Sequence, residues 1–255
     1  MGRRDAYRTD LTALLGDGAV GDTGDAVRAY LAGRSGLPGR RANLELVAAC
    51  ADVAPAPLLR ALATSDDEFE RLCGVVGLGR LLVESDDDGP AARALVGKLR
   101  AAAAAEGWRE REGVAMALQR LGDADPARLR RVVADWAAGP DPLVARAAVA
   151  GICEPRLLHD VATARTAVDA CRAATAVLVA VPPEGRREPP VRTLRQALGY
   201  CWSVAVAAAP EAGLPAFEDL GPPAADDRDL DWVVRTNLRK ARLQRVLVTA
   251  GRAIE

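Results

Sequence analysis

The sequence predicts an all-α fold, a right-handed superhelix of about five to six stacked helical hairpins. An arginine recurs in one helical context at intervals of 30 to 49 residues, at Arg41, Arg71, Arg111, Arg146, Arg195 and Arg235. Half of the residues are apolar but only 4% are aromatic, a composition suited to close contact between helices. No segment shows the sustained alternation of apolar and polar residues that marks a strand. Because one hairpin cannot bury its apolar face alone, the hairpins are expected to stack into a solenoid.

Residues 1–35 are expected to form N-terminal capping helices. Two short helical segments flank a glycine-rich turn, GDGAVGDTGD, at residues 16–25. Terminal units of a solenoid depart from the repeat because one of their faces meets water. The stretch SGLPG then interrupts the chain, and residues 36–255 are predicted to form the repeat solenoid itself.

The first half of this solenoid alternates apolar helical segments with short breakers. The helices expected here cover residues 41–53, 54–63, 68–83, 90–105 and 108–121. Pro55 and Pro57 mark the start of one helix, since proline is tolerated in a first turn. The acidic stretch TSDDE caps the helix that begins at Glu68, and ESDDDGP separates that helix from the next.

The second half follows the same pattern, with a longer irregular stretch near its end. The helices expected here cover residues 127–138, 143–152, 157–181, 191–209 and 231–248, with one short helix inside 210–229. The segment PPEGRREPP, residues 182–190, is the most linker-like stretch of the chain and is expected to be a loop.

Charge and cysteine usage limit the class of function. There are 34 basic and 35 acidic residues, a net charge of −1, whereas a nucleic-acid-binding domain is usually strongly basic. A nucleic-acid partner is therefore disfavoured. Five cysteines share no metal-binding spacing and are typical of a reduced, cytoplasmic protein. The start of the chain lacks the apolar core of a secretory signal, and no apolar stretch is long enough to cross a bilayer, so no membrane partner is expected.

Two segments, DPLVARAAVAGI and DWVVRTNLRKARL, resemble the second helix of HEAT repeats, where an aspartate opens the helix and an arginine follows four or five residues later. The matching pairs are Asp67 with Arg71, Asp141 with Arg146 and Asp231 with Arg235. Together with SGLPGRRANLEL and WREREGVAMALQRLGD, these segments are similar to bacterial HEAT-repeat proteins over roughly residues 35–245. The resemblance implies an armadillo-like solenoid and an interaction role, and it implies no reaction.

The arginine series is the first candidate site. Equivalent residues of a solenoid line one surface, so a row of guanidinium groups on the concave face would recognise carboxylates or phosphates of a partner. In the structural alternative, each arginine pairs with an aspartate of its own or the neighbouring hairpin. The residues predicted to bind a partner are Arg71, Arg111, Arg146, Arg235, Trp108 and Trp232.

A second hypothesis rests on Trp108 and Glu112, which share one face of a helix. This pair is distantly similar to the HEAT-like alkylpurine DNA glycosylases, in which tryptophans flank a carboxylate in a concave basic groove. The resemblance implies a role for Glu112 in stabilising an oxocarbenium-like sugar, with Trp202 and Tyr200 as further aromatic walls. The structural alternative is one packed ring and one solvated charge.

The remaining motifs carry less chemistry. The last helix is basic and residues 66–88 are acidic. This separation of charge would either steer an anionic partner towards one end of the protein or reflect two ordinary solvated faces. Asn43 and Asn237 each follow an arginine by two residues and are expected to satisfy backbone groups. One histidine, His159, with scattered cysteines cannot form a familiar zinc site. No metal, cofactor or catalytic residue is predicted. The sequence favours a non-catalytic scaffold that binds a protein partner, with alkylated-DNA repair as the alternative.

Overall fold

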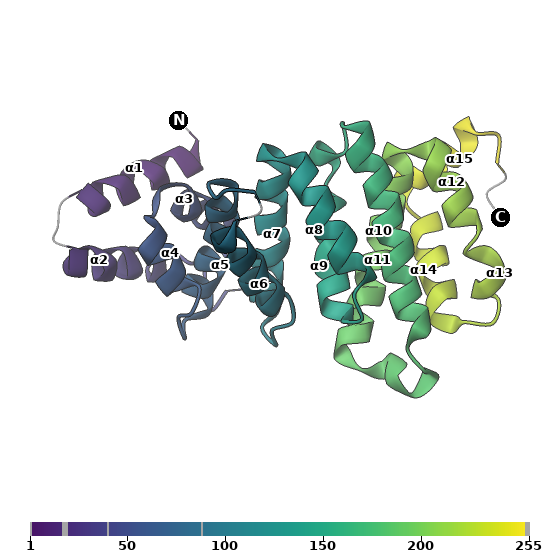
Figure 1. Ribbon diagram of the computed structural model, residues 1–255, viewed down its shortest axis with the longest axis horizontal. Helices are drawn as coiled ribbons and strands as arrows, with labels where there is room; N and C mark the ends of the chain where they lie inside the picture. The colour runs from purple at the N-terminus through teal and green to yellow at the C-terminus, as the bar shows by residue number, and fades with distance from the viewer. Residues whose placement is uncertain (1, 17–19, 40, 88, 253–255) are drawn as a thin grey trace. The chain divides into compact units, whose positions relative to one another are not determined.

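The computed structural model describes residues 2–16, 20–39, 41–87 and 89–252. Within these ranges the chain is helical and contains no strand, which confirms the all-α prediction (Figure 1). The chain divides into two compact units, Met1–Leu121 and Gly122–Glu255. The predicted division into capping helices and a solenoid after residue 35 stays a prediction.

The first unit contains the helices up to the boundary, which falls within α7. They are α1 (Arg3–Gly16), α2 (Val20–Ala32), α3 (Leu44–Val53), α4 (Ala56–Leu62), α5 (Glu68–Val83), α6 (Pro90–Ala103) and α7 (Trp108–Ala124). The prediction of a turn over residues 16–25 is wrong from Val20 onward, where α2 begins, and residues 17–19 lie outside the described residues. Val27 and Leu31 of α2 are completely buried, and this packing offsets the weak helix propensity of its glycines.

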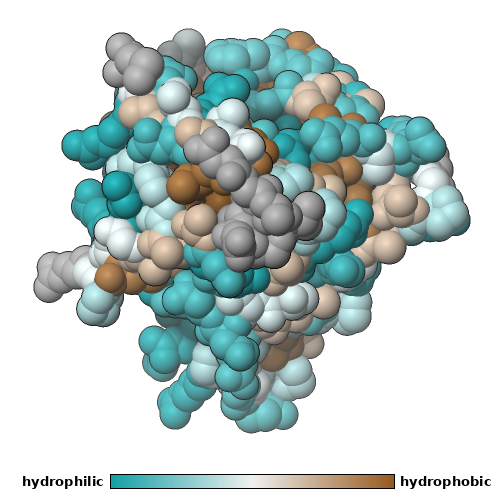
Figure 2. All heavy atoms as spheres, turned by 90° about the vertical axis from the view of Figure 1, so that its left-hand side faces the viewer, coloured by the Kyte–Doolittle hydropathy of each residue, from teal (hydrophilic) through white to brown (hydrophobic). Residues whose placement is uncertain are grey.

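Helix α5 forms the centre of the first unit. It contacts α2, α3, α4 and α6, and every residue from Leu72 to Gly79 is buried. Its first turn is capped as the sequence predicts, because the Asp67 carboxylate accepts hydrogen bonds from the backbone N–H groups of Phe69 and Glu70, both at 2.9 Å. The sequence therefore places both ends of this helix correctly. Figure 2 shows one face at this end of the chain, where hydrophilic side chains cover most of the surface.

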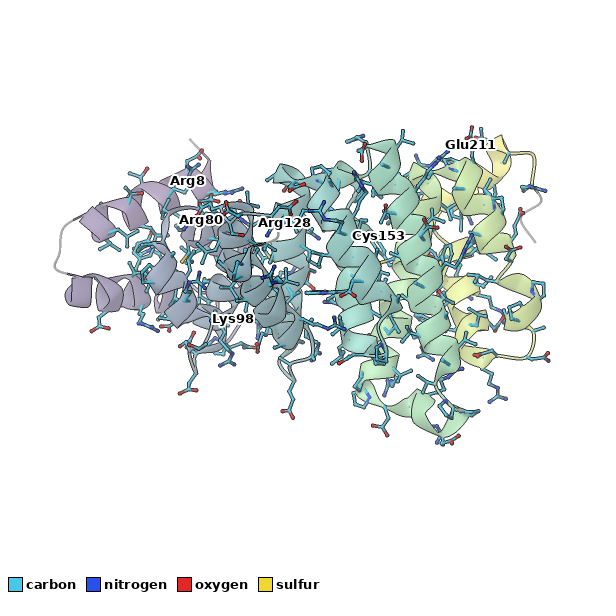
Figure 3. All side chains as sticks on the ribbon, in the orientation of Figure 1. Arg8, Arg80, Lys98, Arg128, Cys153 and Glu211 are labelled. Carbon is cyan, nitrogen blue, oxygen red and sulfur yellow. The ribbon has the colours of Figure 1, made fainter. Side chains whose placement is uncertain are left out.

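Asp52, at the end of α3, holds several elements of the first unit together. Its carboxylate accepts a forked pair of hydrogen bonds from Arg4 of α1, with a shortest distance of 2.7 Å, and pairs with Arg120 of α7. Arg80 of α5, labelled in Figure 3, donates to the carbonyl oxygens of Asp52 and Ala54, both at 2.6 Å. These bonds satisfy carbonyls that the end of α3 leaves without helical partners. Burial alone would raise the Asp52 pKa, but hydrogen bonds from Arg120 and Arg4 lower it overall.

An Asp52→Asn substitution should destabilise the protein by about 2 kcal/mol at neutral pH, because it removes the charge that Arg4, Arg8 and Arg120 share. The folded pKa of Asp52 lies below its unfolded value, so its contribution is complete above the unfolded pKa of about 4 and is lost as pH falls through the folded pKa. Urea unfolding at pH 7 and pH 3 should show the two proteins converging in acid. Asp123→Asn is the control, since Asp123 pairs with a half-exposed Arg156. A gap independent of pH would contradict this role.

The second unit contains the remaining helices. They are α8 (Pro126–Ala138), α9 (Pro142–Ile152), the 3-10 turn η1 (Pro155–Leu157), α10 (Val161–Ala180), η2 (Pro183–Arg187), α11 (Pro189–Ala208), α12 (Pro210–Glu218), α13 (Gly221–Ala224), α14 (Arg228–Leu238) and α15 (Ala241–Thr249). In this unit α8 packs on α9 and α10, α11 packs on α9, α10 and α14, and α12 packs on α10 and α11. The largest buried side chains of this unit are Trp136 and Trp202.

Two predicted helices of this unit are wrong in their bounds. The helix expected from Leu157 begins only at Val161, because the Asp160 carboxylate caps the backbone N–H of Thr163 at 2.9 Å. The helix expected over 231–248 is two helices that meet at Arg239 and Lys240. The buried positions explain this break: Leu243 follows the last buried residue of α14 by six positions, which is out of phase with a continuous helical face.

The segments expected to be irregular hold more structure than predicted. Residues 182–190 contain η2, and the stretch over 210–229 contains both α12 and α13 instead of one short helix. Burial of apolar side chains stabilises these two short helices, since Leu214 and Phe217 of α12 and Ala224 of α13 are buried. Among the described residues, no helix is both long and apolar enough to span a membrane.

Candidate functional site

Two arginines of the recurring series, Arg71 and Arg111, make the same local contact. Arg71 donates to the carbonyl oxygen of Ser65, and Arg111 donates to that of Ala105 at 2.7 Å, each reaching six residues back into the loop before its helix. Arg71 also lies 3.6 Å from the carboxylate of Glu110. These contacts brace a loop against the start of the following helix. These are contacts within the fold, as the structural alternative expects, but the acceptors are loop carbonyls and a glutamate and not the aspartates that it names.

The other members of the series differ from one another. Arg235 pairs with Asp231, four residues earlier, at 2.8 Å and remains 69% exposed. The prediction that Asp231 opens its helix is therefore wrong. Asp227 is the capping residue, because its carboxylate accepts hydrogen bonds from the backbone N–H groups of Asp229 and Leu230. Asp141 does cap α9 as expected. Arg146 lies on α9 and is half-buried, and Arg41 is exposed in the loop before α3.

Trp108 and Glu112 lie on one turn of α7 in the first unit. The Trp108 ring is 55% exposed and the guanidinium of Arg109 sits 4.8 Å from its centre, while Arg109 also pairs with Glu68. Glu112 is half-buried. Trp202 is not an aromatic wall of a groove: its side chain is completely buried, and its ring nitrogen donates to the hydroxyl of Thr175 at 3.0 Å. Tyr200 is exposed on α11 of the second unit, where Arg242 lies over its ring.

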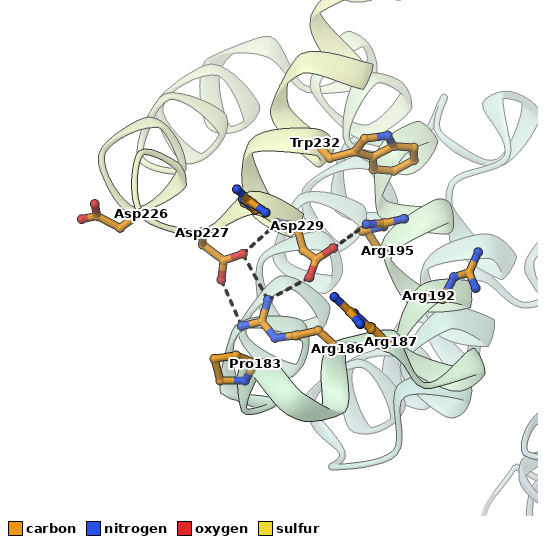
Figure 4. Close-up of a pocket in the computed structure, with 10 residues that line it drawn as sticks. Pro183, Arg186, Arg187, Arg192, Arg195, Asp226, Asp227, Asp229 and Trp232 are labelled. Carbon is orange, nitrogen blue, oxygen red and sulfur yellow. Dashed lines mark hydrogen bonds and ion pairs between the residues drawn. The ribbon is translucent and has the colours of Figure 1, made fainter.

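A cleft in the second unit is lined by five arginines. Its volume is about 670 Å³, and η2, the start of α11 and the start of α14 form its walls (Figure 4). We call it the arginine cleft. It is lined by Pro183, Arg186, Arg187, Arg192, Arg195, Asp226, Asp227, Arg228, Asp229 and Trp232.

Arg186 fixes the shape of the arginine cleft. Its guanidinium donates to the carbonyls of Val179 and Val181, at 2.9 and 2.6 Å, and forms a forked pair with the Asp227 carboxylate at 3.0 and 3.1 Å. It lies 3.6 Å from Asp229 as well. Because Asp227 also caps α14, this one side chain ties η2 to the N-terminus of that helix. Burial would raise the Asp227 pKa, but the Arg186 hydrogen bond and the backbone N–H of Leu230 lower it overall.

Arg195 and Trp232 form the opposite wall. Arg195 pairs with Asp229, and its guanidinium lies 4.8 Å from the centre of the Trp232 ring. The ring packs so closely on α11 that a Cβ added at Gly199 would lie 2.7 Å from it. Trp232 nevertheless remains 36% exposed. The indole is therefore held rigidly and keeps one part free for a contact.

Three arginines of the cleft are not used by the fold. Arg187, Arg192 and Arg228 are exposed, and within the described residues none of their guanidinium groups has a hydrogen bond or ion pair (Figure 4). Arg192 lies in the first turn of α11 and Arg228 is the first residue of α14. A cation in the first turn of a helix faces the positive end of the helix dipole. The positive charges of Arg192 and Arg228 therefore destabilise the isolated protein, and a bound anion would compensate for them.

The arginine cleft joins two residues that the sequence singled out, Arg195 and Trp232, but it brings in none of the other predicted partner-binding residues. Sequence reasoning missed Arg186, Arg187, Arg192 and Arg228. Two sequence features could have indicated these residues: the basic pair in PPEGRREPP and the alternating charges in DDRDLD. Both features lie where a helix begins. Their meeting depends on packing between segments about 40 residues apart. Among the described residues, no group of three or more His, Cys, Asp and Glu side chains could hold a metal ion.

Comparisons with known proteins give no family. No family model matches the chain, and no curated protein matches it. Among solved structures, the chain is similar to two crystal structures of engineered proteins. One is 17% identical, covering 99% of this chain and 98% of that one; the other is 16% identical, covering 96% and 99%. Both superpose with a TM-score of 0.38.

Proposed function

We propose that this protein is a non-catalytic binding module, built from HEAT-like helical hairpins, that recognises an acidic segment of a protein partner. The packing within the second unit supports the hairpin architecture. Helix α8 lies on α10 while α9 lies on α11, and α12 then packs on α10 while α14 packs on α11. In stacked helical repeats, the first helix of each hairpin packs on the first helix of the next hairpin, and the second helix packs on the second.

The observation that carries the binding role is the set of three unpaired arginines beside an exposed tryptophan in one cleft. Tryptophan and arginine are the residue types that most often dominate binding energy at protein interfaces. The cleft is preorganised by Arg186, so a partner would not have to order it. The guanidinium groups of Arg187, Arg192 and Arg228 would receive carboxylates or other anionic groups of the partner.

The test measures binding of a fluorescent pool of acidic peptides, containing Asp, Glu or phosphoserine, to the full chain. An Arg187→Glu/Arg192→Glu variant should lose at least about tenfold in affinity. Arg165→Glu/Arg172→Glu is the matched control, because it reverses two exposed arginines of α10 in the same unit and should bind like the parent. Binding should weaken as salt is added. Equal losses in both variants, or no binding of any peptide, would refute the proposed role of the cleft.

The alternative, removal of alkylated bases from DNA, places the chemistry at Glu112 beside the exposed ring of Trp108. It predicts salt-sensitive DNA binding and base release that disappears on Glu112→Gln. A chain that does not bind DNA at low salt would exclude it.

A further inference from the structure

The charges of the arginine cleft do not balance. It contains five arginines and three aspartates. Arg186 and Arg195 are matched by Asp227 and Asp229. What remains is three arginines, Arg187, Arg192 and Arg228, against Asp226, a surplus of two positive charges on one concave surface. A ligand that carries about two negative charges would neutralise it.

We infer that the arginine cleft binds a phosphorylated side chain of the partner protein. This inference rests on the proposed function and specifies what the cleft recognises. A phosphoryl group carries about −1.5 to −2 charges at neutral pH and presents three acceptor oxygens. Guanidinium groups pair with such a group through two parallel hydrogen bonds each, so three of them provide enough donors. One carboxylate would neutralise only half of the surplus and offers two oxygens.

The surroundings of the cleft favour a single phosphoryl group over a nucleic-acid backbone. Exposed acidic residues are close to it in the chain: Glu184 lies in η2, Glu188 directly follows η2, and Asp226 lies in the wall. A nucleic acid repeats its negative charge at short intervals along the whole contact, so it would meet these carboxylates. A peptide presents one strong charge and can place an uncharged neighbour against the exposed part of Trp232.

The experiment uses three pools of fluorescent 11-residue peptides, identical except that the central residue is serine, glutamate or phosphoserine. Anisotropy with the full chain should show phosphoserine binding at least about tenfold more tightly than glutamate, and serine binding too weakly to measure. Affinity for phosphoserine should fall between pH 7.5 and 5.5, because the phosphate takes up a proton near pH 6. The glutamate pool should change little over the same range.

Variants tie the result to the cleft. Arg187→Gln/Arg192→Gln should remove the preference for phosphoserine while melting at or slightly above the temperature of the parent, because neither side chain has a partner in the fold and Arg192 faces the positive end of the α11 dipole. Arg165→Gln/Arg172→Gln should retain the preference. If glutamate binds as tightly as phosphoserine in a cleft-dependent way, the phosphate inference fails and the proposed function stands. If no pool binds, both fail. If a 20-nucleotide single strand displaces the phosphoserine pool at a lower concentration than pyrophosphate does, the ligand is a nucleic acid and the inference is overturned.

Discussion

A Gly74→Ala substitution should destabilise the first unit by about 3 kcal/mol or more and lower the melting temperature by about 6–12 °C. A Cβ atom at this position would lie 2.0 Å from the backbone nitrogen of Ala63 and 2.5 Å from its Cα. The atoms in the way belong to the backbone at the end of α4, so no side chain can rotate aside. Helices α4 and α5 must separate, and this would disturb contacts along a helix that is buried over its whole central part.

Gly97→Ala is the matched control, because it makes the same chemical change in the interior of α6. Apart from the neighbouring backbone of α6 itself, no atom lies within 4 Å of the added methyl group there. Alanine should therefore stabilise α6 by about 0.5–1 kcal/mol through its better helix propensity. Thermal melting followed by circular dichroism checks both variants. If Gly74→Ala melts with the parent protein, α4 and α5 are not in close contact at this point.

An Asn237→Ala substitution should destabilise the second unit by about 3 kcal/mol. The side chain is completely buried, and its amide donates to the carbonyl oxygens of Leu198 and Val233, at 2.9 and 2.8 Å. Its oxygen accepts from the backbone N–H of Ser203 at 2.9 Å. Alanine would leave these groups without partners between α11 and α14 and would open a cavity. Urea unfolding measures the loss.

Asn43→Ala provides the comparison. From a partly exposed position this residue caps α3 and donates to the Tyr7 hydroxyl and the Arg34 carbonyl, so its removal should cost less, about 1–2 kcal/mol. Asn237→Asp should be destabilising at neutral pH, since a carboxylate would face two carbonyl oxygens. It should recover part of the loss in acid, where the protonated carboxyl can donate one bond. Equal effects of Asn43→Ala and Asn237→Ala would contradict a special role for the buried amide. Because Asn237 belongs to α14, the same bonds position Trp232 and the wall of the arginine cleft.

The sequence predicts Asn43 and Asn237 in the same role, as residues that satisfy backbone groups, and both do so. It does not predict how. The oxygen of Asn43 caps the backbone N–H of Leu46 within its own helix start. Its amide also donates to the Tyr7 hydroxyl, 36 residues away, and Asn237 reaches a neighbouring helix 34 residues away in the chain. The first kind of bond follows from local spacing. The second depends on how helices such as α11 and α14 are packed, and helical periodicity carries no information about that distance.

By itself, the amino-acid sequence determined that the described chain is helical, and it located most helices, with α5 correct at both ends. It also determined the caps at Asp67 and Asp141, because caps act over two or three residues. Only the tertiary structure decided the break after α14 and the burial of Trp202. It also decided the pairing of Arg186 with Asp227, residues that are 41 positions apart. Helix formation is a short-range property of the chain, whereas the arginine cleft exists only where packed helices bring distant loops together.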